Sequence, residues 1–169
     1  MKRLTIVSIA GLLFIAAFAV FLPTPATAGT ILSFERMVAV SGPFLGTANP
    51  IRSVPGGGLP WMITSGRGAL EDDGHLDVQV EGLVLANDPM VPEDLRGVNP
   101  VGSFRAIVSC LSVSGVGSPT TVNVSTDNFP ADTLGNSSIT AVLVLPHPCT
   151  APIVFVTSPT GSWFAASGS

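Results

Sequence analysis

Two histidines are the only imidazole groups in the chain, so any histidine-dependent catalysis must use His75 or His147. His75 lies beside an expected exposed turn, and His147 lies between two prolines. The chain contains no Gly-x-Ser-x-Gly segment, the common setting of a hydrolase nucleophile. The sequence therefore predicts no catalytic residues and favours a protein that is not an enzyme. A small extracellular hydrolase remains an alternative, and it would need two carboxylates facing each other across a cleft.

Acidic residues gather around one glycine-containing turn, where carboxylates could bind calcium. The cluster consists of Glu71, Asp72, Asp73 and Asp77, and the candidate ligands are Asp72, Asp73 and Asp77. Their spacing does not match the twelve-residue calcium loop, and a solvated hairpin tip explains the same residues. We therefore predict a solvated turn, with a weak calcium site as the alternative, and we expect no other metal and no cofactor.

The two cysteines of the chain are Cys110 and Cys149. In an exported protein they would meet an oxidising compartment, so we predict that they form one disulfide. A metal site that uses both cysteines and His147 is disfavoured, because a structural zinc site needs four ligands that this chain cannot easily supply.

The N-terminal segment has the pattern of an export signal. Lys2 and Arg3 precede an apolar run from residue 4 to residue 22, and Ala26-Thr27-Ala28 then supplies a small-x-small cleavage site. We predict a signal peptide over residues 1–28, a mature chain that begins at Gly29, and a single secreted domain over residues 29–169. An uncleaved membrane anchor is the alternative, because the apolar run approaches the length of a spanning helix.

Charge excludes some classes of partner. Residues 29–169 hold five arginines and no lysine against eleven acidic residues, a formal charge of −6. Nucleic acids and anionic membrane surfaces attract basic patches, so we expect neither as a partner of the mature protein. An unknown protein or surface ligand is the expected partner.

The clearest structural signal is a hairpin formed by residues 61–70 and 75–86. Leu76, Val78 and Val80 alternate with polar residues, which is the period of a half-buried strand. Pairing Leu70 with Leu76 requires a three-residue loop over residues 72–74, with Gly74 in the left-handed conformation. The same register places Gly66 and Gly68 opposite Val80 and Val78, where a close neighbour would fit.

Turn residues separate the other apolar segments into short strands. Gly and Pro are frequent, helix-period segments are nearly absent, and one helical turn is expected around residues 92–95. This pattern predicts an all-β protein of about eight strands, either a two-sheet sandwich of Greek-key or immunoglobulin-like type or a closely related barrel. The other expected strands cover residues 30–40, 101–113, 121–126, 138–145, 153–157 and 162–166.

Several segments resemble a group of uncharacterised secreted bacterial β-rich proteins. They are GPFLG at 42–46, PIRSVPGGGLPW at 50–61, FRAIVSCL at 104–111, CTAPIVFVT at 149–157 and GSWFA at 161–165. The resemblance covers most of the mature chain and implies an exported single domain. It implies no activity, because none is assigned to the group.

A proline-stiffened loop over residues 50–61 is the predicted binding site. Arg52 offers a planar donor group, and Trp61 offers apolar area, two residue types that often anchor interfaces. The alternative is that Arg52 pairs with a nearby carboxylate and Trp61 fills the core. We therefore predict a non-enzymatic domain that binds a protein or cell-surface component through its loops. A carbohydrate-binding module is the second interpretation, and it would need Trp61 or Trp163 exposed on a sheet face.

Overall fold

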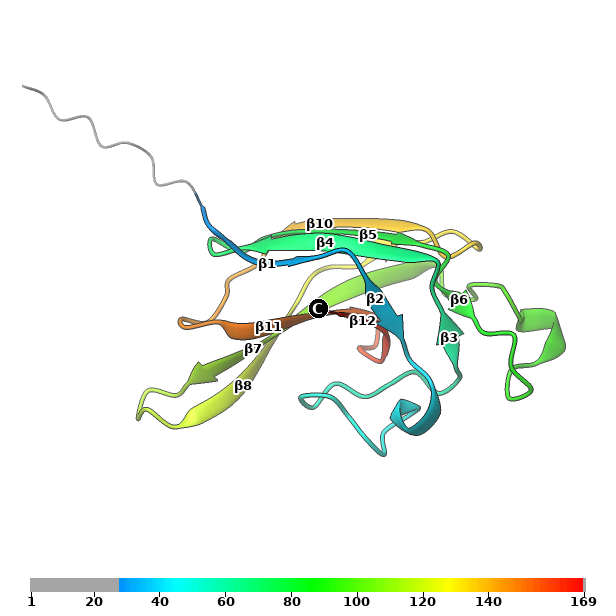
Figure 1. The fold of residues 1–169 in the computed structure, drawn as a ribbon, viewed down its shortest axis with the longest axis horizontal. Coiled ribbons are helices and arrows are strands. Elements are labelled where there is room, and N and C mark those ends of the chain that lie inside the picture. Colours follow the sequence, from blue (N-terminus) through cyan, green and yellow to red (C-terminus); the bar gives the residue numbers. More distant parts are fainter. Residues whose placement is uncertain (1–27, 169) are drawn as a thin grey trace, which may run out of the picture.

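The computed structural model describes residues 28–168, and its elements are two layers of antiparallel strands (Figure 1). The predicted signal segment lies outside the described residues apart from Ala28. The strands are β1 (Thr30–Phe34), β2 (Met37–Ala39), β3 (Trp61–Met62), β4 (Ser65–Glu71), β5 (His75–Glu81), β6 (Val84–Leu85), β7 (Ser103–Val113), β8 (Pro119–Ser125), β9 (Phe129–Pro130), β10 (Ser137–Val142), β11 (Thr150–Thr157) and β12 (Trp163–Ser167).

Two sheets form the layers of the sandwich. The four-stranded sheet has the order β1-β4-β5-β10. The six-stranded sheet has the order β2-β12-β11-β7-β8, with β9 also pairing with β7. Strands that are neighbours in a sheet are often distant in the chain, as β5 and β10 are, so the connections cross between layers. The all-β prediction is confirmed, and of its two architectures the molecule adopts the sandwich.

The core lies between the two sheets and follows the two-residue period of the strands. On β5, Leu76, Val78 and Val80 are buried while their neighbours face outward or are half-buried. On β7, the residues that share the inner face are Phe104, Ala106, Val108 and Cys110, and all four are fully buried. Apolar alternation therefore determines the inward face of β5, whereas on β7 Ile107 and Ser109 of the opposite face are buried as well.

The β4–β5 hairpin has the predicted register. Leu70 pairs with Leu76, and Gly66 and Gly68 pair with Val80 and Val78. A methyl group added at Gly66 would approach the side chain of Met37 to 2.6 Å, which explains the missing side chain there. The turn also matches, because Gly74 has a φ of +91°.

Three predicted strands are divided, and β9 is an additional short strand, which raises the number from about eight to twelve. The segment 30–40 forms β1 in one sheet and β2 in the other. Phe34 and Met37 are both buried while Glu35 and Arg36 between them are exposed, a spacing that one continuous strand does not allow. The segments 61–70 and 75–86 are interrupted as well, and their outer parts pair as β3 and β6.

The remaining local predictions also have clear outcomes. Cys110 and Cys149 form the predicted disulfide, which joins β7 to the residue before β11. A short 3-10 turn over Glu93–Leu95 matches the expected helical turn. Between residues 28 and 168, no helix has the length and apolar character needed to cross a membrane.

Candidate binding surfaces

Arg52, a predicted binding residue, is tied to three strands of the six-stranded sheet. Its Nη1 donates to the carbonyl oxygens of Ser109 on β7 and Ala151 on β11, both at 2.8 Å. Its own carbonyl accepts a hydrogen bond of 2.9 Å from Nδ2 of Asn123 on β8. Its partners are therefore carbonyl groups and not the carboxylate that the alternative interpretation expected.

The loop that carries Arg52 covers the outer face of the six-stranded sheet. Asn123 pairs with Ser109, so both lie on the face opposite to the fully buried Cys110. On this outer face Phe155 packs near Trp163, with 6.0 Å between the ring centroids, and Phe44 of the loop also packs near Trp163, at 6.4 Å. Residues 41–60 therefore act as a cover over a second apolar layer.

Trp61, the other predicted binding residue, lies in the core. Its side chain is only 6% exposed, and its ring stacks on Phe164 with 3.8 Å between centroids. Trp163 is 3% exposed. Neither tryptophan offers a ring face to a sugar, so the surface that a carbohydrate-binding module would need is not formed by these residues.

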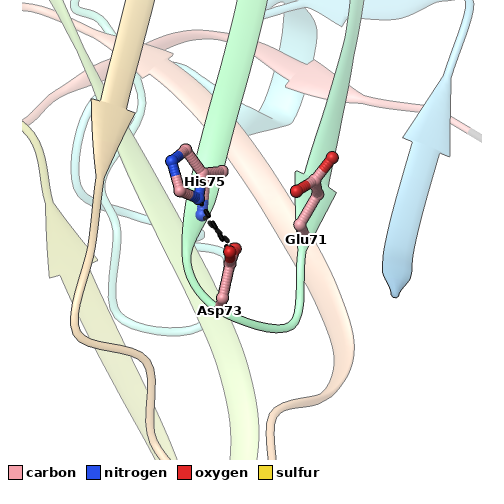
Figure 2. Close-up of side chains that lie close together, drawn as sticks. All are labelled: Glu71, Asp73 and His75. Carbon is pink, nitrogen blue, oxygen red and sulfur yellow. Dashed lines mark hydrogen bonds and ion pairs between the residues drawn. The ribbon is translucent and has the colours of Figure 1, made fainter. Parts of the chain in front are cut away.

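The acidic turn brings together a set of residues that differs from the predicted calcium ligands. Glu71, Asp73 and His75 have possible ligand atoms within 4.8 Å of one another, at the end of β4, in the turn and at the start of β5 (Figure 2). Asp72 instead accepts a hydrogen bond from the backbone N–H of Gly29 at 2.9 Å. Asp77 accepts one from the hydroxyl of Thr140 at 3.0 Å. Asp72, Asp73 and Asp77 therefore point to different partners.

Two of the three residues in this cluster, Asp73 and His75, form an exposed ion pair. Nδ1 of His75 lies 2.9 Å from Oδ2 of Asp73. The side-chain hydrogen bond and the charge of Asp73 raise the pKa of His75. Hydrogen bonds from the backbone N–H and the side chain of His75 lower the pKa of Asp73. Because both partners are satisfied locally, the cluster is adequately explained as a solvated hairpin tip.

An open groove of about 1040 Å³ lies beside the ends of β5 and β10. Glu81 and Asp132 are the carboxylates among the residues that line it. Asp132 accepts hydrogen bonds from the backbone and side-chain N–H groups of Asn136, and the backbone N–H contributes most to lowering its pKa. A general acid needs the opposite shift, so Asp132 does not have the character of the general acid of a glycosidase.

An arm formed by the β7–β8 hairpin carries three exposed apolar residues, Leu111, Val113 and Val116. In Figure 1 its tip projects at the lower left, away from the four-stranded sheet. Val116 at the tip is 89% exposed, and Leu111 and Val113 are 41% and 48% exposed. No residue of β8 is buried, although the strand is fully paired with β7. Sequence analysis predicted these strands but missed the arm, because alternation alone does not reveal that the opposite sheet ends short of it.

Comparison of the chain with protein families, characterised proteins and solved structures finds no match.

Proposed function

We propose that this protein is an exported, non-enzymatic β-sandwich domain that binds a protein partner through the free edge of β8. In this mode an extended segment of the partner adds to the six-stranded sheet as a further strand. Main-chain hydrogen bonds provide affinity, and alternate side chains provide specificity. The observation that carries the proposal is the edge position of β8 on an arm with exposed apolar residues.

The backbone of β8 has hydrogen-bonding groups available for such a strand. The N–H of Thr126 donates to the carbonyl of Ala106 at 3.0 Å. Since antiparallel strands alternate the direction of their N–H and C=O groups, Thr121, Asn123 and Ser125 direct theirs toward the free edge. The side chains of these three residues are exposed.

The arm also lacks the features that usually protect an edge strand from pairing. Charged side chains, particularly lysine, and bulges are the common protections. Residues 106–126 contain no charged residue. The β7–β8 register runs without a shift from Val113–Pro119 to Ile107–Ser125, and Pro119 is only the first residue of the strand. An added strand would lie directly beside the exposed side chains of Thr121, Asn123 and Ser125, with Leu111 and Val113 one strand further away on β7.

Two features support export. The first is the signal-like pattern of residues 1–28, and the second is the disulfide between Cys110 and Cys149, a bond typical of oxidising compartments. Intact-mass measurement of the exported protein tests this part of the proposal. We expect a chain that begins at Gly29, and full-length protein retained in the membrane would contradict it.

A site-specific photo-crosslinker in place of Val113 tests the binding surface. We expect a discrete crosslinked protein adduct when the variant is exported from its host, and we expect Thr121→Pro to abolish the adduct. Proline removes the outward N–H of Thr121 without breaking a bond to β7, and edge strands tolerate it. An adduct of twice the mass of the chain would identify the partner as a second copy.

The matched control is Thr140→Pro on β10, the free edge of the other sheet. This variant should retain the adduct. The proposal is wrong if no adduct forms, if Thr121→Pro leaves it unchanged while the variant remains folded, or if Thr140→Pro alone removes it. Thermal unfolding of both proline variants shows whether each is folded.

A further inference from the structure

Gly29 is the first residue whose backbone is held by hydrogen bonds in the described chain, and both of its bonds go to Asp72. The N–H of Gly29 donates to Oδ1 of Asp72 at 2.9 Å. The carbonyl of Gly29 accepts from the N–H of Asp72 at 2.8 Å. Backbone hydrogen bonding in the described chain therefore begins at Gly29, the residue with which the predicted mature protein begins.

The carboxylate of Asp72 has acidic neighbours in the sequence and forms no ion pair with another described residue. It stands between Glu71 and Asp73 in the sequence. The described residues form two ion pairs, Arg67 with Glu81 and His75 with Asp73, and neither includes Asp72. His147 lines the same small pocket as Asp72, but the two are not an ion pair.

We propose that cleavage between Ala28 and Gly29 turns this hydrogen bond into an ion pair that fastens β1 to the tip of the β4–β5 hairpin. Hydrolysis of the peptide bond consumes one water and leaves a carboxylate on Ala28 and an ammonium group on Gly29. The new charge arises on the nitrogen that already lies 2.9 Å from Oδ1. This inference rests on the export proposed above.

The geometry suits an ammonium group. A Cβ built on Gly29 would lie 3.4 Å from Oδ2 of Asp72, so both carboxylate oxygens are close to this residue. An ammonium nitrogen has three N–H donors and can address both oxygens. β1 is the edge strand of the four-stranded sheet, and terminal edge strands fray unless they are tied down. The ion pair would hold the chain at Gly29, the residue immediately before β1.

A double-mutant cycle on residues 29–169, which contain all twelve strands, tests the proposal. One change is acetylation of the Gly29 amino group, which keeps an N–H but removes the charge. The other change is Asp72→Asn. We expect acetylation to lower the melting temperature of the wild-type chain by about 1–4 °C, as for an exposed ion pair. We expect this difference to disappear in the Asp72→Asn variant and to shrink in 1 M salt.

Asp94→Asn, which removes a carboxylate from the 3-10 turn far along the chain, is the control and should leave the effect of acetylation unchanged. The proposal is contradicted if acetylation has no effect, or if its effect is the same with and without the Asp72 carboxylate. The cycle uses purified mature chain, so its result does not depend on export. An exported protein whose mass shows a different first residue would contradict the processing step separately.

Discussion

The guanidinium of Arg52 donates a hydrogen bond of 2.8 Å to the carbonyl oxygen of Ser109, and this bond holds a long loop against the middle of a sheet. The same nitrogen reaches the carbonyl of Ala151 on the neighbouring strand. That carbonyl is available because the pairing of β11 with β7 is irregular between Thr150 and Ile153, where Ala151 has a φ of +45°. The bulge therefore creates the acceptor that the arginine uses.

Arg52→Ala should lower the free energy of unfolding by about 1–3 kcal/mol, because it removes two charge-assisted hydrogen bonds to carbonyl groups. Urea denaturation measures the change. Arg67→Ala is the matched control, since Arg67 is exposed and lies 4.0 Å from Glu81, and it should stay within about 0.5 kcal/mol of wild type. Equal stability of the two variants, with loss of the crosslinked adduct only in Arg52→Ala, would instead make Arg52 a binding residue.

Replacing both Cys110 and Cys149 with alanine should lower the free energy of unfolding by about 2–4 kcal/mol. The disulfide closes a loop with a sequence separation of 39 residues and so restricts the unfolded chain. Chemical denaturation of the variant and of wild type, the latter with and without reductant, measures the effect. We expect reduced wild type to resemble the variant. A variant as stable as the oxidised protein would show that the bond adds nothing.

Sequence reasoning worked best where local chemistry decides the structure. The β4–β5 register follows from the alternation around Leu76 and from the requirement of a left-handed glycine at Gly74, both visible in a dozen residues. The break between Phe34 and Met37 was not predictable in this way, because it depends on which sheet each half joins. The partners of Arg52 were also hidden, since they are main-chain carbonyls made available by a distant bulge.

Burial of Trp61 and Trp163 shows a related limit. An aromatic residue in a strand can face the core, the outer surface or a covering loop, and its sequence neighbours do not distinguish these cases. Here Trp61 stacks in the core on Phe164, while Trp163 lies beneath the loop that carries Phe44. Predicting the burial of Trp163 would have required knowing that residues 41–60 fold back over the outer face.

Gly74→Ala should destabilise the protein strongly, whereas Gly97→Ala should have a smaller effect. Both glycines have positive φ, +91° and +72°. A Cβ at Gly74 would clash with the carbonyl oxygen of Leu143, while a Cβ at Gly97 meets nothing within 4 Å. Conformational strain alone should lower the free energy of unfolding by about 1 kcal/mol in Gly97→Ala. In Gly74→Ala the clash adds to this cost.

Thermal unfolding of the two glycine variants checks this prediction. The difference between their melting temperatures measures the cost of the clash with Leu143 separately from the cost of a positive φ. Equal melting temperatures would mean that the β4–β5 turn and the chain just after β10 move freely enough to accept a methyl group at Gly74, contrary to the close packing seen there.

Asp73→Asn should change the dependence of stability on pH in a defined window. The pKa of His75 is raised above its ordinary 6.5, so protonated His75 adds stability below about pH 6.5 and this contribution is lost as the pH rises through the raised pKa. The pKa of Asp73 is lowered below 3.8, so its contribution is present above that value and is lost as the pH falls through the lowered pKa. Both contributions are present together between about pH 4 and pH 6.5.

Wild type should therefore exceed Asp73→Asn in melting temperature most clearly near pH 5, with a smaller difference at pH 3 and pH 9. An NMR titration of the His75 imidazole provides the direct readout, and its pKa should fall toward 6.5 in Asp73→Asn. Asp94→Asn, which removes a carboxylate far from the turn, should leave the pKa of His75 unchanged. If the imidazole titrates identically in wild type and in Asp73→Asn, the 2.9 Å contact between Asp73 and His75 is not maintained in solution.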